Sequence, residues 1–214
     1  MTSVSGLAFS VENECGCNER PVVLRALNDG VRDFFARSES CLWSVSHENV
    51  PLVDSYSAVP GSGWHIRRIL AVQLVKNDRK RTLCPLEYEL SSDWSGVRLK
   101  IRHDDADRIR ILSVLVPVAG GNISIPDQYL TQYSDGIVYA ACCRIVRQTG
   151  RPWFSPELEQ YFNMQYLREV TRAITTAEDQ ALEWEQSTSD SSVSSVSSVP
   201  SDQSVSSPES SSGA

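Results

Sequence analysis

Histidine and aspartate are the residues of this sequence whose chemistry is best suited to acid–base catalysis or metal binding. The three histidines, His47, His65 and His103, form no HxH or HExxH pattern and stand beside no nucleophile motif. The acidic run 104–107 resembles the start of a calcium-binding loop, but the glycine and the closing glutamate of such a loop are missing at the required spacing. We expect ordinary strand or turn histidines and a solvated hairpin tip.

The cysteines and the glycine-containing segment give no stronger signal. Cys15 and Cys17 are accompanied by no CxxC pair and no clustered histidine. Cys142 and Cys143 lie within a helical pattern, where thiols act as small apolar side chains. The segment 61–63 lacks both the lysine and the strand-to-helix context of a phosphate-binding loop. We therefore predict no catalytic residue, no cofactor-binding residue, no metal site and no enzymatic activity.

The N-terminal residues and the hydropathy of the chain indicate the compartment. Residues 1–10 lack the basic start and the long apolar run of a signal peptide, and no segment has the roughly 18 apolar residues of a membrane span. We expect a soluble chain with free thiols, made in a reducing cytoplasm and without contact to a membrane.

The C-terminal segment 187–214 differs in composition from the rest of the chain. It contains 15 serines, three acidic residues, no lysine, no arginine and no aromatic residue, so it cannot form a hydrophobic core. The remainder carries 20 basic and 24 acidic residues, a net charge of −4. A net-negative chain is unsuited to wrapping nucleic acid, although it can surround DNA without gripping it.

The basic residues are strongly biased toward arginine, with 17 arginines and three lysines. Arginine is favoured where bidentate pairing to carboxylates fixes an interface, which is typical of a subunit of an assembly. The base composition of the genome produces the same bias, so both interpretations stand.

Two amphipathic helices, within 125–184, form the region around which the chain is organised. Apolar residues recur at steps of three and four in both, which predicts that the helices pack against each other. The first helix carries Tyr129, Leu130, Tyr133, Ile137, Ala140, Ala141 and Ile145, and the second carries Leu158, Phe162, Tyr166, Val170, Ala173, Ala177 and Ala181.

A short corner joins these two helices at residues 148–156. Gly150 suits the left-handed residue just past a helix end, and Ser155 followed by Pro156 supplies an N-cap with proline at the first helical position. Gly150, Pro152, Trp153 and Pro156 are thus predicted to be structural corner residues. We expect Trp153 to be wedged under the corner.

An earlier helix is predicted between Asn18, as its N-cap, and Ser38. Leu24, Leu27, Val31, Phe34 and Phe35 mark one face, and this period continues across Gly30 although Asn-Asp-Gly is a strong turn signal elsewhere. Residues 1–17 carry no period, so we expect an N-terminal arm or a short cap there.

Period-two alternation and β-branched residues replace the helical pattern between residues 41 and 119, which predicts a small antiparallel sandwich or barrel. We expect a turn at 76–79 and a closing hairpin around 103–107. The predicted strands are 43–47, 50–53, 56–59, 64–75, 82–86, 97–102 and 109–116.

The predicted fold is therefore α+β, a helical bundle with a β-sandwich or barrel-like insertion between the first and second helices and an extended C-terminal arm. The predicted boundaries are 1–17 for the N-terminal arm, 18–40 and 123–186 for the bundle, 41–122 for the β module, and 187–214 for the serine-rich arm.

The helix that starts at Pro156 is predicted to run to about Glu185, roughly 45 Å at 1.5 Å per residue. That length exceeds what a small bundle needs to cover. Its second half is either a solvated helix end or a projection into neighbouring subunits, with Arg168, Arg172 and Trp184 as the predicted subunit interface.

Valines recur in the serine-rich segment, which suggests two alternative roles for it. Serine-rich linkers are usually flexible and have no further role. The alternative is an arm that lies along a partner as an extended strand, with its valines in shallow pockets. The predicted partner-binding residues of that arm are Val193, Val196, Val199, Pro200 and Val205.

Three stretches of the sequence resemble the head-to-tail adaptor (connector) proteins of tailed bacteriophages, particularly the ring subunits beneath the portal of short-tailed phages. Residues 25–35 are similar to the early helix of that family, and 125–133 with Ala140-Ala141 to its second helix. Residues 150–153 and Tyr161-Phe162 are similar to its corner and third helix.

The resemblance implies a virion protein that forms a ring, commonly of twelve subunits, between the portal protein and a tail or nozzle protein. In such proteins the helical bundle forms the ring wall and terminal extensions fasten subunits to their neighbours. DNA passes through the channel without specific binding, and an acidic balance suits a channel that repels phosphate. The implied location is the head–tail junction of the virion, with assembly in the host bacterial cytoplasm.

Two other classes of function remain open. The β region is compatible with a carbohydrate- or receptor-binding tail module in which Trp43, Trp64 and Trp94 stack on sugars, although tryptophans in a small sandwich are usually core residues. A hydrolase with a scattered site requires a pocket that gathers His47, His65 and aspartates.

Overall fold

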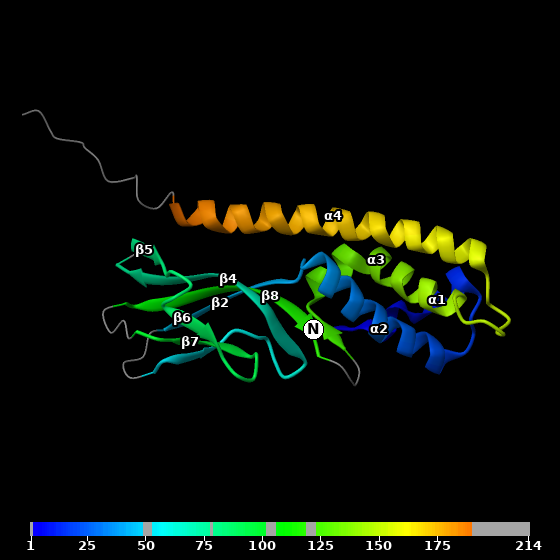
Figure 1. Ribbon diagram of the computed structural model, residues 1–214, viewed down its shortest axis with the longest axis horizontal. Coiled ribbons are helices and arrows are strands. Elements are labelled where there is room, and N and C mark those ends of the chain that lie inside the picture. Colours follow the sequence, from blue (N-terminus) through cyan, green and yellow to red (C-terminus); the bar gives the residue numbers. More distant parts are fainter. Residues whose placement is uncertain (1, 49–52, 78, 102–105, 119–122, 190–214) are drawn as a thin grey trace, which may run out of the picture.

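The computed structural model describes residues 2–48, 53–77, 79–101, 106–118 and 123–189, with side chains up to residue 186. It is a mixed α+β fold, as the sequence predicts. Helices lie at one end of the elongated molecule and strands at the other, and one long helix runs along both (Figure 1). In chain order the elements are β1 (Thr2–Ser3), the 3₁₀ helix η1 (Val4–Leu7), α1 (Ala8–Cys15), α2 (Arg20–Ser38), β2 (Leu42–Glu48), β3 (Ser55–Ser57), β4 (Trp64–Lys76), β5 (Arg79–Thr82), β6 (Tyr88–Leu90), β7 (Gly96–Leu99), β8 (Arg108–Pro117), β9 (Ser124–Ile125), α3 (Asp127–Val146) and α4 (Pro156–Ser189).

The prediction of an N-terminal arm over residues 1–17 is wrong. This segment forms β1, η1 and α1, and β1 pairs with β9. Val4, Ala8 and Val11 are almost completely buried in the core. Their spacing of four and then three residues is a helical period, but an eight-residue helix shows too few turns of it to be recognised.

The helix α2 is continuous across the Asn-Asp-Gly sequence, as the apolar period predicts, and begins two residues after the expected Asn18 cap. Gly30 explains why a glycine is present in its middle. A Cβ atom at Gly30 would lie 3.1 Å from the backbone nitrogen of Ala141 and 3.3 Å from the carbonyl oxygen of Ile137, so α2 crosses α3 at close range.

Gly136 gives α3 the reciprocal close approach to α2. A Cβ atom at Gly136 would overlap the ring of Phe34, which is completely buried. Gly30 and Phe34 are four residues apart on α2, and Gly136 and Ala140 are four residues apart on α3. Each glycine therefore accepts a side chain of the facing helix.

An aromatic cluster forms around this crossing and reaches both other parts of the fold. The centroid of the Phe34 ring lies 5.4 Å from the ring centroid of Tyr133 on α3 and 6.4 Å from that of Tyr166 on α4. The ring of Phe35 lies 6.3 Å from that of Trp64, the first residue of β4. Two adjacent residues of α2 thus connect the helices to the strands.

The strands β2 to β8, which lie between α2 and α3 in the sequence, form two antiparallel sheets with the orders β2-β8-β4-β5 and β3-β7-β6. Tyr56 and Val97 of the smaller sheet share one hydrophobic core with Ile66 and Ile111 of the larger sheet. The turn between β4 and β5 lies at 76–79, as predicted. The predicted hairpin of 97–102 with 109–116 is wrong, because β7 pairs with β3 and β6 whereas β8 pairs with β2 and β4.

Replacing Gly136 with alanine should destabilise the protein by roughly 2 kcal/mol, because the added methyl group collides with the buried ring of Phe34. Alanine otherwise favours a helix over glycine by about 1 kcal/mol, so a loss of stability reports the collision. Urea unfolding followed by circular dichroism measures the free energy of unfolding.

Gly61→Ala is the matched control, since a Cβ atom there meets nothing within 4 Å. It should change the free energy of unfolding by less than about 0.5 kcal/mol. Adding Phe34→Leu to Gly136→Ala should cost less than the two single changes together. An unchanged or raised stability of Gly136→Ala would contradict the close crossing.

Candidate functional site

The helix α4 contains 34 residues and is about 51 Å long. Its first half packs on α2 and α3, where Tyr166 donates a 2.7 Å hydrogen bond to Asp33, and the ring of Phe162 lies 6.2 Å from that of Tyr139. Burial, reinforced by the Asp33 carboxylate, raises the pKa of Tyr166. The packing of the two helices that the sequence predicts is thus present.

The corner before α4 has the geometry that its sequence predicts. Gly150 is left-handed, with φ of 77°. The hydroxyl of Ser155 accepts a hydrogen bond from the backbone of Leu158 at 3.3 Å, and Pro156 is the first residue of α4. The Ser155 backbone also donates to the carbonyl of Val146 at 3.1 Å, which ties the corner to the end of α3.

Trp153 is only half-buried in the corner, so it is less deeply wedged than predicted. Its ring packs against the core, and the guanidinium of Arg151 lies 5.6 Å from the ring centroid. The indole nitrogen is buried without a hydrogen-bond partner among the described residues. Pro152 precedes it in the same turn.

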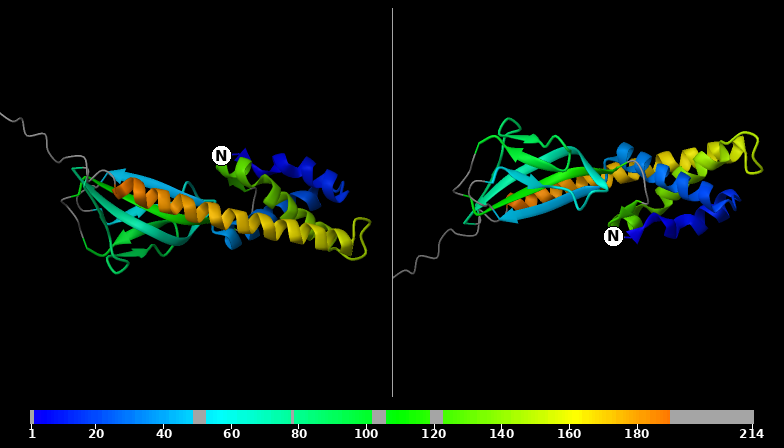
Figure 2. Two further views of the ribbon diagram at one scale, coloured as in Figure 1. Left: turned by 90° about the horizontal axis from the view of Figure 1, so that it is seen from above. Right: turned by 90° about the horizontal axis from the view of Figure 1, so that it is seen from below.

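The second half of α4 lies on the four-stranded sheet of its own chain and does not project from the molecule, which corrects one of the two expectations for it (Figure 1). Seen from above and below, the helix crosses from the helical end to the strands (Figure 2). The indole of Trp184 donates a 3.2 Å hydrogen bond to the Ser44 hydroxyl of β2, and Arg110 of β8 lies 5.0 Å from its ring centroid.

The three residues predicted as a subunit interface lie in different environments. Trp184 packs on the sheet, and Arg172 donates to the carbonyl of Gln132 at 3.3 Å and pairs with Glu169 at 2.6 Å. Arg168 is exposed. Their contact with another subunit stays a prediction, and only Arg168 presents its side chain to solvent without a partner in the same chain among the described residues.

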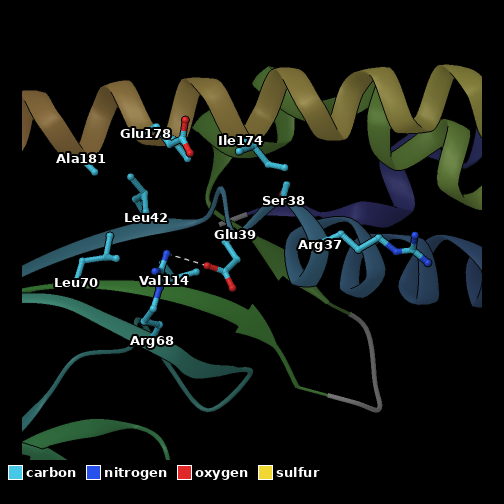
Figure 3. A pocket seen from close by; sticks show the side chains of 11 residues that line it. Arg37, Ser38, Glu39, Leu42, Arg68, Leu70, Val114, Ile174, Glu178 and Ala181 are labelled. Carbon is cyan, nitrogen blue, oxygen red and sulfur yellow. Dashed lines mark ion pairs between the residues drawn. The ribbon is translucent and has the colours of Figure 1, made fainter.

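A pocket of about 230 Å³ lies between α4 and the junction at which α2 ends and β2 begins (Figure 3). Its floor is apolar and its rim is charged. The lining residues are Arg37, Ser38, Glu39, Leu42, Arg68, Leu70, Val114, Ile174, Ala177, Glu178 and Ala181.

Glu39 fixes the rim of this pocket. It caps α2 in the left-handed conformation, with φ of 49°, which is strained for a residue other than glycine. Its carboxylate pairs with Arg68 at 2.9 Å (Figure 3) and with Arg67 at 3.1 Å, so the strained joint is held by β4. On the opposite side a hydrogen bond from Arg37 to Asp33 raises the pKa of the guanidinium.

The pocket can accept an apolar side chain of a partner and hold a polar group of that partner at its charged rim. Among the described residues that line it, the only carboxylates are those of Glu39 and Glu178, and there is no histidine or cysteine. This composition suits recognition of a protein surface.

The solvent face of α4 carries large apolar side chains, a feature that the sequence reading missed. Met164 is 63% exposed, Leu167 46% and Leu182 54%. At 100° per residue these three positions lie within one arc opposite the buried face. No periodic signal marked them, because polar residues such as Thr171, Thr175 and Glu178 separate Leu167 from Leu182 on this side of the helix. Exposed apolar side chains gathered on one face mark a protein contact.

The tryptophans of the β region differ in exposure. Trp64 is 4% exposed and packs in the core, whereas Trp94 is 52% exposed with a φ of 59°. Trp43 is half-buried against the core. An open pocket of about 440 Å³ next to Trp94 is lined by Ser57, Val59, Pro60, Gly61, Ser62, Trp64, His65, Asp93 and Ser95.

The open pocket brings His65 and Asp93 of the β region together, and Ser57, which His47 contacts, also lines it. The imidazole of His47 contacts the carbonyl of Ser57 at 2.5 Å. Hydrogen bonds from Ser91 and Ser95 lower the pKa of Asp93 to about 2, so its carboxylate stays charged and bound in its own turn. His103 lies outside the described residues.

Cys142 and Cys143 are buried in the helical core, as expected for small apolar side chains. Cys15 and Cys17 are also buried. Within the described ranges no three histidine, cysteine or acidic side chains gather to hold a metal ion. The arm residues Val193, Val196, Val199, Pro200 and Val205 lie outside the part of the chain that the structure describes.

Comparison of the sequence with known family models and with curated proteins finds no match. None of the described helices is long and apolar enough to cross a bilayer. The function is therefore inferred from the surfaces of α4, the pocket beneath it and the resemblance of the sequence.

Trp153→Ala should lower the free energy of unfolding by roughly 2 kcal/mol, less than the 3–5 kcal/mol of a fully buried tryptophan because the ring is half-exposed. Phe154→Ala, at a residue that is 40% exposed, is the control and should cost less than about 1 kcal/mol. Urea unfolding measures both. If Trp153→Ala kept full stability but failed to assemble, Trp153 would belong to a contact surface instead of the corner.

Proposed function

We propose that the protein is a structural subunit of a bacteriophage virion, a head-to-tail adaptor that forms a ring between the portal and the tail. The observation that carries this proposal is the presence of large exposed apolar side chains on the solvent side of α4, at Met164, Leu167 and Leu182. Such a face is stable in water only at a cost that contact with another protein removes. The sequence resemblance to connector proteins supports the same class.

The architecture suits a rigid wall subunit. One continuous helix contacts the aromatic core at its first half and the four-stranded sheet at its second half. The two ends of the molecule are thereby linked by an element that resists bending, as a wall between two larger assemblies requires.

Ring formation requires that two different surfaces of each subunit meet, because a head-to-tail contact closes into a ring when its rotation allows. The α4 face and the pocket below it are two such surfaces. We propose a homo-oligomeric ring, of twelve subunits by resemblance, that contacts the portal protein on one side and a tail or nozzle protein on the other.

DNA passes through the proposed ring without specific binding. The body of the chain carries four more acidic than basic residues, which disfavours a tight grip on phosphate. The proposed location is the head–tail junction of the virion, with assembly in the host bacterial cytoplasm. The serine-rich segment 187–214 is proposed as an arm that contacts the portal or an adjacent subunit.

Leu167→Asp combined with Leu182→Asp should prevent ring formation while leaving the fold intact, because both side chains are about half-exposed and make the apolar face charged. Electron microscopy of the chain mixed with portal rings of the same phage measures assembly, and circular dichroism measures folding.

Asn163→Asp is the control, since it adds charge at an exposed position of the same helix without removing an apolar side chain. It should assemble like the parent. Full assembly by the double variant, or a chain that stays monomeric beside a portal, would refute the proposed function of the α4 face.

A carbohydrate- or receptor-binding module is a second candidate, and the exposure of Trp94 favours it. The residues on either side of Trp94, Asp93 and Ser95, line an open pocket with Ser57 and Ser62, whose hydroxyls can bind those of a sugar. If this candidate is correct, Trp94→Ala should weaken binding to a surface polysaccharide of the host at least about tenfold, an expected loss of roughly 1.4 kcal/mol. Trp43→Phe, away from the pocket, should bind like the parent in the same calorimetric titration. No binding by the parent chain would remove this candidate.

A further inference from the structure

The four-stranded sheet has two edges that differ in how they are protected. At one edge, β5 has four residues, and Arg79, Lys80 and Arg81 make it strongly basic. Short length and charge are two devices that keep an edge strand from pairing with another chain. The sequence of β5 therefore discourages further strands.

At the other edge, β2 lacks these devices. It has seven residues, and its register with β8 runs without a shift from Leu42 opposite Val114 to Glu48 opposite Arg108. It contains no proline, lysine or arginine, and its only formal charge with neutral His47 is on Glu48, at its end. A regular, nearly uncharged edge of this length is ready to accept a further strand.

The backbone groups that β2 offers at this edge follow from its pairing. Leu115 donates to the carbonyl of Cys41 at 2.9 Å, so by antiparallel alternation Trp43, Val45 and His47 direct their backbone groups to β8. The residues between them direct theirs to the open edge.

Three of the outward residues remain open. The amide of Leu42 donates to Ser40, and its carbonyl accepts from the Tyr129 hydroxyl. Ser44, Ser46 and Glu48 are exposed, and within the described residues no strand pairs with their side of β2. These three residues offer N–H and C=O groups at two-residue steps.

The helix α4 brings the C-terminal segment of the chain to this edge. Leu42 and Ala181 both line the pocket, and further along both elements Trp184 donates a hydrogen bond to Ser44. The chain therefore runs in the same direction in α4 and in β2. Ser189, the last residue of α4, lies about 7.5 Å further along the helix than Trp184. Glu48 lies roughly 13 Å beyond Ser44 along the strand. The chain therefore leaves α4 alongside the open groups.

The composition of the segment after Ser189 suits an added strand. Residues 190–199 contain no proline, lysine, arginine or glycine, and Pro200 ends this stretch. The stretch exceeds the seven residues of β2, and its valines, which suit a strand, recur every third residue between pairs of serines.

We propose that residues 191–199 of the same chain add to the free edge of β2 as a fifth, antiparallel strand of the sheet. A short tether gives the segment an effective concentration in the millimolar range, so weak backbone pairing suffices. The segment then protects the edge against pairing between free subunits. This inference depends on β2 and the end of α4, and it concerns the free subunit; the arm contact proposed above requires the segment to leave this edge.

Amide hydrogen exchange resolved by NMR tests the proposal on the full chain and on a chain that ends at Ser189. The amides of Ser44, Ser46 and Glu48 should exchange at least about tenfold faster in the shortened chain, since removal of the added strand frees these donors. The amides of Trp43, Val45 and His47 should not change, because they donate to β8. These alternate amides are the control for an intact sheet.

A matched pair of substitutions in the full chain separates pairing from mere presence of the segment. Ser195→Pro removes an amide within the proposed strand and should speed exchange at Ser44, Ser46 and Glu48 as the deletion does. Ser210→Pro, beyond the strand, should leave exchange as in the parent. Equal exchange in the full and shortened chains overturns the proposal. Protection that grows with protein concentration, together with a dimeric mass, also overturns it, because the segment would then come from a second copy.

Discussion

The helices α2 and α3 touch at two glycines. Gly136 of α3 lies against the ring of Phe34, and Gly30 of α2 lies against the backbone of α3, so a side chain at either glycine would collide with the facing helix. This contact fixes the distance and the angle between the two helices. The neighbouring rings then pack in one arrangement, with Tyr166 of α4 on one side and Trp64 of β4 on the other. Because packed interiors tolerate little change in volume, the positions of α4 and of the sheets follow from this crossing.

The helix α4 converts that local contact into the shape of the whole molecule. Its buried face continues from the aromatic cluster to the outer face of the four-stranded sheet, where Leu112 and Val114 are almost completely buried. Its other face exposes Met164, Leu167 and Leu182 among polar residues. The same helix therefore stabilises the fold and presents the surface on which the proposed assembly depends, and the strained joint at Glu39 lies beneath it.

Much of the helical part could be predicted from local pattern. The bounds of α2, the corner at Gly150 and the packing of α3 on α4 follow from apolar periods and end signals that act within a few residues. Two other features could not be predicted in this way. Strand partners depend on residues far apart in the chain, so the place of β7 in a second sheet left no local signal. The exposure of Met164, Leu167 and Leu182 could not be predicted, because it depends on which side of α4 the other elements cover.

The sequence by itself determined the α+β class, the helical hairpin and the composition that separates the serine-rich segment from the body, since each is a property of neighbouring residues. Only the tertiary structure decided where α4 lies, which tryptophan is buried, and which edge of the sheet is open at Ser44, Ser46 and Glu48. These are outcomes of packing between distant segments. An exposed and a buried residue of one type are identical in the sequence and differ only in what the folded chain places beside them.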